Sequence, residues 1–454
     1  METKIDFIKG DTKKCLAMLV LPMMVAMFLN MAYNLVDSLW IGNLLGETAY
    51  AALTNSTPII LILNAVAMGA TNGVSILLSQ AIGAKEKEKT DKMIVTSLVA
   101  AVVFSLTVTA LLEIVLKPIL VFMHTPSEVM QSAYQYLAIY ILGYTAVFLY
   151  CYFTAVLRSF GDSVFQVIAM LICTILNAAL DPLFISFMGF HGAAVATVLS
   201  QTLCLAVMLV YLRRKQFFHL RISLFDKRLI SPFILKGIPS AFQQSIPAIS
   251  TSFLTSLVTG YGISALAAYG ITGKLETILF YPAMALNMAL TSIVGQCVGG
   301  KRYDRARDYI RRAFLYGAIV LMILSLLVVW FSAPLSYLFV DSDAAAAIVS
   351  TYFKIVGVGY ILNTATNCFL GSLNGMGKPV KSMLCMVLYY MIIRMPLAWI
   401  LSRGSLGING IWIAVLISHV IAALAATVMA NHELLRQEQT NRISEKAEAN
   451  TAKS

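Results

Sequence analysis

Long apolar runs separated by short polar connections make up most of this chain of 454 residues. Most runs reach or exceed the roughly 20 residues that an α-helix needs to cross a bilayer. They predict about twelve transmembrane helices, over residues 15–38, 49–82, 93–116, 131–156, 164–187, 193–212, 237–259, 265–298, 313–338, 347–371, 382–402 and 409–431. The second and eighth runs exceed a bare span, so we expect them to tilt or to extend past the membrane.

Lys and Arg are distributed very unevenly between alternate connections. If the N-terminus is cytoplasmic, about 28 of the 33 Lys and Arg fall in cytoplasmic segments, including Arg158, and only Lys117 and Arg403 fall opposite. Cytoplasmic loops of membrane proteins carry such an excess. The sequence therefore predicts a multi-pass protein with both termini in the cytoplasm.

The two halves of the chain repeat each other at an offset of about 216 residues. Gln80-Ala81-Ile82-Gly83-Ala84-Lys85 corresponds to Gln296-Cys297-Val298-Gly299-Gly300-Lys301, and Pro22 corresponds to Pro239 within one residue. Six helices per half is an even number, so both copies insert in the same direction. We predict an all-α membrane protein of two six-helix lobes, related by a pseudo-two-fold axis along the membrane normal.

The predicted organisation is an N-terminal lobe (1–215), a basic cytoplasmic linker (216–236), a C-terminal lobe (237–431) and a polar cytoplasmic tail (432–454). Two such lobes around a midplane cavity are the layout of an alternating-access transporter.

The composition supports a membrane protein and argues against several other classes. The chain is 59% hydrophobic, with a mean hydropathy of +0.81, which is far too apolar for a soluble domain. Its net charge of +11 lies in the connections, so it reflects membrane topology rather than nucleic-acid binding. The chain contains no nucleotide-binding, metalloprotease or hydrolase motif. We therefore expect no enzyme activity and no cofactor, and transport driven by an ion gradient.

Asp181 lies in an apolar run, in Asn177-Ala178-Ala179-Leu180-Asp181-Pro182. A carboxylate at the centre of a membrane helix costs roughly 2.5–3.5 kcal/mol, and such acids usually mark an ion or proton pathway. Asn177 shares its helix face, and Pro182 weakens the helix beside it. The structural alternative is an acid at a helix end that reaches the outer interface.

Asp37 ends a polar stripe in the first run, formed with Asn30, Tyr33 and Asn34. A stripe turned to lipid would be costly, so it should line a cavity or pack against another helix. The alternative for Asp37 is a helix cap. If Asp37 and Asp181 meet, repulsion and desolvation would favour a shared, exchangeable proton.

Four other polar residues have open interpretations. Thr197 either completes an oxygen-rich site or bonds back to its own helix. Glu276 either attracts cations from a cavity or reaches the outer surface. Arg394 aligns roughly with Leu180 of the first half and is a structural or gating candidate, whereas Glu113 is expected to form an interfacial ion pair with Lys117. The abundant Met, Phe and Tyr suit apolar cations, although ordinary helix packing explains most of them.

The ensemble of motifs resembles the multidrug and toxic compound extrusion (MATE) family, in its DinF-like prokaryotic branch. The resemblance covers about residues 9 to 430 and rests on Leu21-Pro22, Asn34-Leu35-Val36-Asp37-Ser38-Leu39-Trp40-Ile41-Gly42, Leu157-Arg158-Ser159-Phe160-Gly161-Asp162, Asn177-Ala178-Ala179-Leu180-Asp181-Pro182, Gly192-Ala193-Ala194-Val195-Ala196-Thr197 and Lys274-Leu275-Glu276.

The resemblance implies antiport of drugs against H⁺ or Na⁺ in the inner membrane of a prokaryote. It implies a proton or sodium site at Asp37, Asn177, Asp181 and Thr197, and bending of the first helix around Pro22. Where the NorM-like branch has acids, the seventh and tenth helices here carry Gln243, Gln244, Asn363 and Asn367, so a second sodium site is not expected. The substrate-cavity candidates are Asn30, Tyr33, Asn34, Gln244, Glu276 and Arg394.

We expect small organic cations as substrates, a lipid environment, a monomer and no nucleic-acid partner. The alternative function is a flippase for lipid-linked sugars. That function would call for several arginines at the midplane, and the apolar runs offer essentially one, Arg394.

Overall fold

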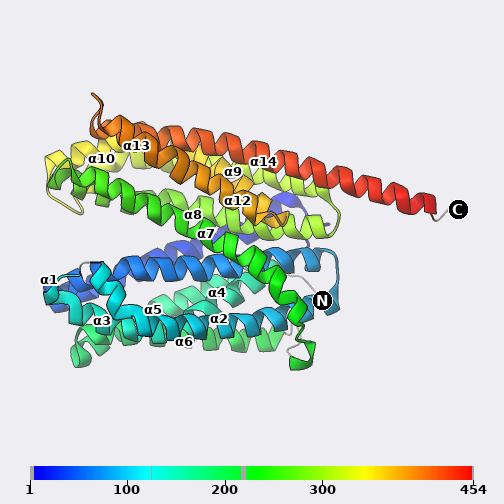
Figure 1. Ribbon diagram of the computed structural model, residues 1–454, viewed down its shortest axis with the longest axis horizontal. Helices are drawn as coiled ribbons and strands as arrows, with labels where there is room; N and C mark the ends of the chain where they lie inside the picture. The colour runs from blue at the N-terminus through cyan, green and yellow to red at the C-terminus, as the bar shows by residue number, and fades with distance from the viewer. Residues whose placement is uncertain (1–4, 124, 216–220, 452–454) are drawn as a thin grey trace. The chain divides into compact units, whose positions relative to one another are not determined.

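The computed structural model describes residues 5–123, 125–215 and 221–451, and within them the chain is helical and has no strand (Figure 1). The helices of the first half are α1 (Thr12–Gly83), α2 (Lys87–Phe122), α3 (Ser127–Leu142), α4 (Tyr144–Ser159), α5 (Val164–Met188) and α6 (Phe190–Lys215). Two short 3₁₀ turns follow, η1 (Ile222–Leu224) and η2 (Lys227–Leu229). The second half has α7 (Ile230–Thr259), α8 (Ile263–Gly299), α9 (Tyr303–Ser336), α10 (Asp343–Val356), α11 (Gly359–Gly375), α12 (Pro379–Met386), the π-helix η3 (Val387–Arg394), α13 (Met395–Ser402) and α14 (Ile408–Thr451).

The helices account for the predicted number of membrane spans. Among the described residues, nine helical segments are long and apolar enough to cross a membrane. Two bent pairs also qualify, α3–α4 with a bend of 46° and α10–α11 with a bend of 55°. The more polar α7 is 30 residues long and matches the remaining predicted run. The predicted class, a polytopic all-α membrane protein of about twelve spans in two lobes, is confirmed.

The structure departs from the predicted runs where glycine changes the path of the backbone. The first two runs form one continuous element, α1, which leaves helical geometry only at Gly46 (φ 78°, ψ −167°). Glycine reaches this left-handed region without the steric cost that a Cβ would bring. The fourth run breaks at Gly143, where a Cβ would lie 2.5 Å from the side chain of Val198. Apolar periodicity does not reveal such breaks.

The internal repeat is visible in the backbone itself. Left-handed residues in the first half recur 216 positions later with similar φ angles: Gly46 (78°) and Gly262 (97°), Lys85 (59°) and Lys301 (56°), and Gly161 (80°) and Gly377 (77°). The bent pair α3–α4 likewise has its counterpart in α10–α11. The two halves therefore share their turns and bends as well as their helices.

The chain forms two compact units. The first consists mainly of Leu21–Leu78 and Glu86–Ala241, and the second of Asp6–Val20, Ser79–Lys85 and Phe242–Ser454. The helix α1 therefore begins in the second unit and passes to the first between Val20 and Leu21. Pro22, the predicted hinge, lies directly after this transition and inside the helix.

Hydrogen bonds hold the segment that precedes and begins α1 within the second unit. The carbonyl oxygen of Phe7 accepts hydrogen bonds from Arg305 Nε (3.0 Å) and the Tyr309 hydroxyl (3.2 Å), and Arg305 also donates to the carbonyl oxygen of Gly10. The Thr12 hydroxyl donates to the carboxylate of Asp308 at 2.6 Å. The Phe7 side chain is fully buried. We call Asp6–Val20 the entry segment.

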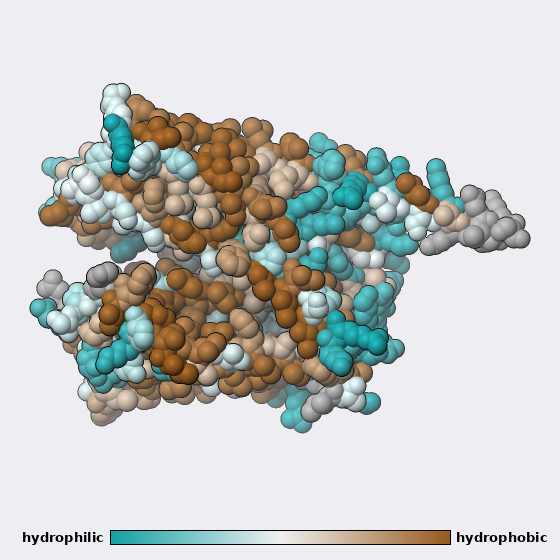
Figure 2. All heavy atoms as spheres, viewed as in Figure 1, coloured by the Kyte–Doolittle hydropathy of each residue, from teal (hydrophilic) through white to brown (hydrophobic). Residues whose placement is uncertain are grey.

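Apolar side chains gather over the middle of the helices in each unit, and polar side chains gather toward their ends (Figure 2). Large apolar side chains are exposed on the helices, among them Phe187 near the end of α5 (80% exposed) and Trp330 in α9 (83% exposed). Such exposed apolar surface suits contact with lipid rather than water. The long α14 continues past the other helices of its unit (Figure 1).

Candidate functional site

The structure brings Asp37 and Asp181 together in the first unit. Asp37 lies on α1 with 8% of its surface exposed, and Asp181 lies on α5 fully buried. Their carboxyl groups lie next to each other. Two neighbouring carboxyl groups can hydrogen-bond only when one of them carries a proton, because an ionised carboxylate is an acceptor only. Within the described chain, no Lys or Arg side chain takes part in this interaction.

Asn177 supports this pair from within α5. Its side-chain nitrogen donates to Asp181 Oδ1 at 3.0 Å, and the side chain is fully buried. The four-residue spacing places both groups on one helix face. Pro182 follows directly and cannot donate a backbone hydrogen bond, which leaves a carbonyl oxygen of α5 free one turn earlier.

Thr197 lies beside this site on α6. It is buried, and among the described residues its hydroxyl has no hydrogen-bond partner. It therefore does not bond back to its own helix, which was one of its two interpretations. The hydroxyl of Tyr33 lies next to Thr197 and Ser200 and near Asp37. Tyr33 thus belongs to the same buried group. Its position in the polar stripe did not predict this.

The polar stripe of α1 divides between two environments. Tyr33 and Asp37 are buried in the first unit, whereas Asn30 and Asn34 are exposed on its surface. Asn34 donates to the carbonyl oxygen of Asn30 at 2.7 Å, and the Asn30 nitrogen lies 4.0 Å from the sulfur of Met170. One edge of the stripe therefore forms the acidic site, and the other remains accessible.

Glu276 is engaged by two tyrosines inside the second unit. Both Tyr352 and Tyr360 donate a hydroxyl hydrogen bond to Glu276 Oε1, the latter at 2.5 Å. Its neighbour Lys274 instead lies over the ring of Phe339 at 5.0 Å from the centroid. The two side chains thus have separate environments.

Arg394 ends the π-helix η3 and is buried in the same unit. It donates to the Ser418 hydroxyl at 2.9 Å and to the Tyr389 hydroxyl at 2.8 Å, and it lies 4.5 Å from the ring centroid of Tyr390. The Tyr389 hydroxyl also bonds His419 Nδ1 at 2.6 Å. Arg394 and Glu276 interact electrostatically, so the second unit balances its buried acid with a buried base.

The environments of two other residues were not predicted correctly. Glu113 and Lys117 form no ion pair in the described structure, and Glu113 Oε1 is buried without a hydrogen-bond partner, so that prediction is wrong. Arg158, assigned to a cytoplasmic segment, is 1% exposed near the end of α4. Its position at the end of an apolar run gave no signal of this burial.

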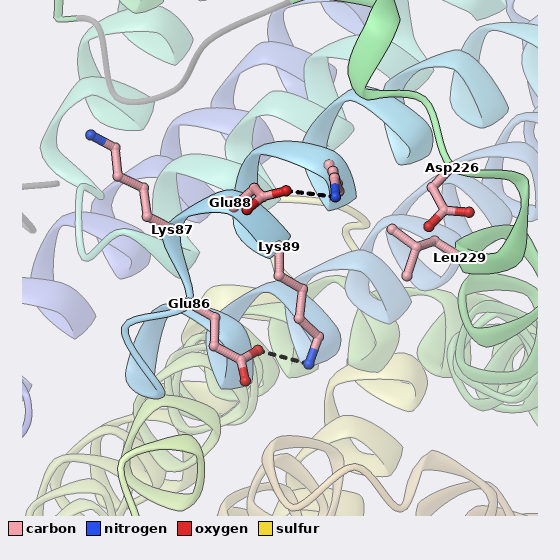
Figure 3. Close-up of a pocket in the computed structure, with 7 residues that line it drawn as sticks. Glu86, Lys87, Glu88, Lys89, Asp226 and Leu229 are labelled. Carbon is pink, nitrogen blue, oxygen red and sulfur yellow. Dashed lines mark ion pairs between the residues drawn. The ribbon is translucent and has the colours of Figure 1, made fainter.

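A surface pocket of about 530 Å³ lies at the start of α2 and beside η2 (Figure 3). Lys89 pairs with Glu86, and Lys92 pairs with Glu88, each at 2.7 Å. The Lys87 side chain points away from these pairs (Figure 3). Because its three acids and three lysines balance, the pocket offers no net charge to attract an ion.

The sequence matches one family model twice. The model, described as MatE, covers residues 22–183 and again residues 239–400. The chain belongs to the MatE family. The resemblance to MATE transporters drawn from the motifs is confirmed, and the two matches coincide with the two halves of the repeat.

MatE proteins with a similar sequence or structure support this assignment along nearly the whole chain. The chain is 26% identical over 418 residues to the probable multidrug resistance protein YoeA of Bacillus subtilis, covering 89% of this chain and 90% of YoeA. It is 28% identical over 440 residues to the probable multidrug resistance protein YpnP of the same organism, covering 93% and 95%. A crystal structure of MATE in the straight conformation has a TM-score of 0.91 at 23% identity, covering 97% of this chain and all of that one.

The described residues contain no group of three or more His, Cys, Asp or Glu side chains that could bind a metal ion. The polar groups around Asp37 are two carboxyl groups, an amide and a hydroxyl, whose oxygens can accept a proton's hydrogen bond or face a cation.

Proposed function

We propose that this MatE protein is a secondary active efflux antiporter, which exports amphipathic organic cations in exchange for H⁺ or Na⁺ by alternating access. The observation that carries the proposal is the buried Asp37–Asp181 pair, which lacks a basic partner within the described chain. The names of YoeA and YpnP as probable multidrug resistance proteins support drugs as the substrate class.

The pair requires a positive charge for electrostatic reasons. Two unit charges 4 Å apart repel by about 4 kcal/mol at an effective dielectric of 20, and desolvation adds to this cost. A proton or Na⁺ removes the repulsion, and so does an organic cation. Occupation by ion and by drug is then mutually exclusive, which is the requirement for antiport. Thr197 and Asn177 would complete the oxygen set for Na⁺.

We further propose that α1 bends around Pro22 when the occupant of the pair changes. Proline removes one backbone hydrogen bond and permits a kink. The assignment of α1 to two compact units, with the transition beside Pro22, supports a hinge there. The orientation belongs to the proposal too: the distribution of Lys and Arg supports both termini in the cytoplasm of a prokaryote.

The proposal predicts that neutralising either acid stops transport. In cells that overexpress the protein, Asp37→Asn and Asp181→Asn should each abolish ethidium efflux, because an amide neither binds a proton reversibly nor carries the charge. Glu113→Gln is the matched control, since Glu113 is another carboxyl within an apolar run and should tolerate the change. Full efflux by both aspartate variants at normal expression would refute the site.

The coupling ion can be identified with purified protein in liposomes. An imposed H⁺ gradient and an imposed Na⁺ gradient should be compared for their ability to drive ethidium accumulation. Thr197→Val separates the two ions further, because Na⁺ needs the hydroxyl oxygen as a ligand and a proton does not. Transport driven by neither gradient would exclude antiport. The flippase alternative has no support from the comparisons.

A further inference from the structure

We propose that the second unit contains a separate subsite for one uncharged hydrogen-bonding group of a substrate, such as an amide, urea or hydroxyl group. The inference rests on the proposed function, because it concerns which molecules the transporter accepts. In this proposal the second unit binds an uncharged polar group of the substrate, and the acid pair of the first unit is a separate site.

The subsite is a small cavity among α7, α8, α11 and α12. Its volume is about 30 Å³, enough for one small polar group and too small for a whole drug. Four amide side chains and four apolar ones line it: Gln243, Gln244, Asn287, Asn367, Met284, Met288, Leu370 and Met386. Flexible methionine walls adapt to the varied apolar surroundings of such a group.

The amide side chains form short chains of hydrogen bonds that leave capacity for a ligand. Asn287 donates to Asn367 Oδ1 at 3.4 Å, and Asn367 donates to Asn363 Oδ1 at 3.1 Å. Asn374 donates to Gln243 Oε1 at 3.3 Å. Each amide offers two donor hydrogens and two acceptor lone pairs. Outside the lining, the buried nitrogen of Asn363 and the buried oxygen of Asn374 have no partner among the described residues, so these chains of amides are not saturated.

The charge of the lining selects neutral groups. None of the residues lining the cavity is ionisable, and transferring an unpaired charge into such a site is far more costly than transferring an amide that finds partners. Two ionisable side chains on the helices that line the cavity or directly follow them, Glu276 and Arg394, already have partners. Glu276 accepts a hydrogen bond from Tyr360, and Arg394 donates to Ser418 and Tyr389. A neutral donor–acceptor group therefore satisfies the cavity, whereas a cation does not.

Gln244 allows a direct test, because it is half-buried in the lining and Met has nearly its shape. Binding of two radiolabelled probes to the purified full-length protein should be compared. Chloramphenicol is uncharged and carries an amide and hydroxyls, while tetraphenylphosphonium is a cation without hydrogen-bonding groups. Gln244→Met should weaken chloramphenicol binding about three- to tenfold, the effect of one neutral hydrogen bond. It should leave tetraphenylphosphonium binding unchanged.

Two further variants make the test decisive. Gln166→Met on α5 is the matched control and should change neither affinity. Gln244→Glu should weaken chloramphenicol and strengthen tetraphenylphosphonium, because it introduces a negative charge. Equal affinities in wild type and Gln244→Met, or parallel loss of both probes, would overturn the subsite. Failure of the proposed function is distinguishable, since it would appear as the absence of cation efflux by the wild type.

Discussion

At the scale of single residues, the two units treat a buried carboxyl group in opposite ways. In the first, Asp37 and Asp181 lie next to each other without a basic partner among the described residues. In the second, Glu276 accepts hydrogen bonds from two tyrosines and interacts with Arg394. The first arrangement needs a positive charge from outside the chain, and the second is satisfied internally. This difference supports ion exchange in the first unit and a structural role for Glu276.

The hydrogen bond between Asn177 and Asp181 can be measured through stability. Asn177→Leu leaves Asp181 Oδ1 buried without its donor and should cost about 1–3 kcal/mol, lowering the melting temperature of the purified protein. Replacing both partners, Asn177→Leu with Asp181→Leu, should recover part of the loss, because the unsatisfied oxygen of Asp181 is removed, although Asp37 then loses its neighbour. A double variant that melts below the single variant would contradict this account, and efflux should stay absent in the double variant.

At the scale of elements, the entry segment is attached to the second unit although most of α1 belongs to the first. Arg305 makes two of the bonds that hold it, to the carbonyl oxygens of Phe7 and Gly10. Because α1 is continuous, this attachment fixes one end of the helix beside the proposed hinge at Pro22. Bending there would move the rest of α1 against a fixed end.

Loss of this attachment should be visible by hydrogen exchange. Arg305→Ala removes charge-assisted hydrogen bonds worth roughly 1.5–3 kcal/mol. Amides of residues 5–15 should then exchange about ten- to a hundredfold faster in mass spectrometry. Arg311→Ala is the matched control, because Arg311 is an exposed arginine of the same helix. Unchanged exchange in Arg305→Ala would show that Arg305 does not hold the segment.

The sequence predicts the membrane spans and some local side-chain arrangements, but it does not predict contacts that arise from packing between helices. Apolar length predicts the spans, because each span must bury about 20 residues in lipid. The spacing of Asn177 and Asp181 predicts their shared face, whereas a meeting of Asp181 with Asp37 enters only as a condition for a shared proton. The partners of Glu276 could not be predicted, because Tyr352 and Tyr360 meet it only through packing of α8, α10 and α11. The burial of Arg158 depends on tertiary packing in the same way.

At the scale of the whole molecule, duplication extends to backbone geometry. Gly46 and Gly262 occupy the same left-handed conformation 216 residues apart, and a Cβ at either would meet no atom within 4 Å. Any effect of adding a Cβ there must therefore come from the backbone and not from a clash. The repeat thus supplies matched positions for one experiment.

Gly46→Ala and Gly262→Ala should each destabilise the protein by about 1–3 kcal/mol, the cost of this positive-φ geometry for a residue with a Cβ. Gly270→Ala is the control, because Gly270 is helical in α8 and also has open space around its Cβ position. It should stabilise by about 0.5–1 kcal/mol, since alanine is the better helix former. Thermal unfolding in detergent would measure all three, and destabilisation by Gly270→Ala would refute the argument.

The entry segment has one more consequence, which follows from the repeat. Residues 222–236 are the counterpart of residues 6–20 at the same offset, and they belong to the first unit, where the backbone nitrogen of Asp226 donates to Thr96 Oγ1 at 3.0 Å. Each half of the chain thus contributes its leading segment to the unit formed mainly by the other. This is the connectivity of a domain-swapped dimer joined into one polypeptide. A single six-helix chain could form a closed dimer by the same reciprocal exchange, with the covalent linker serving only to fix the pairing.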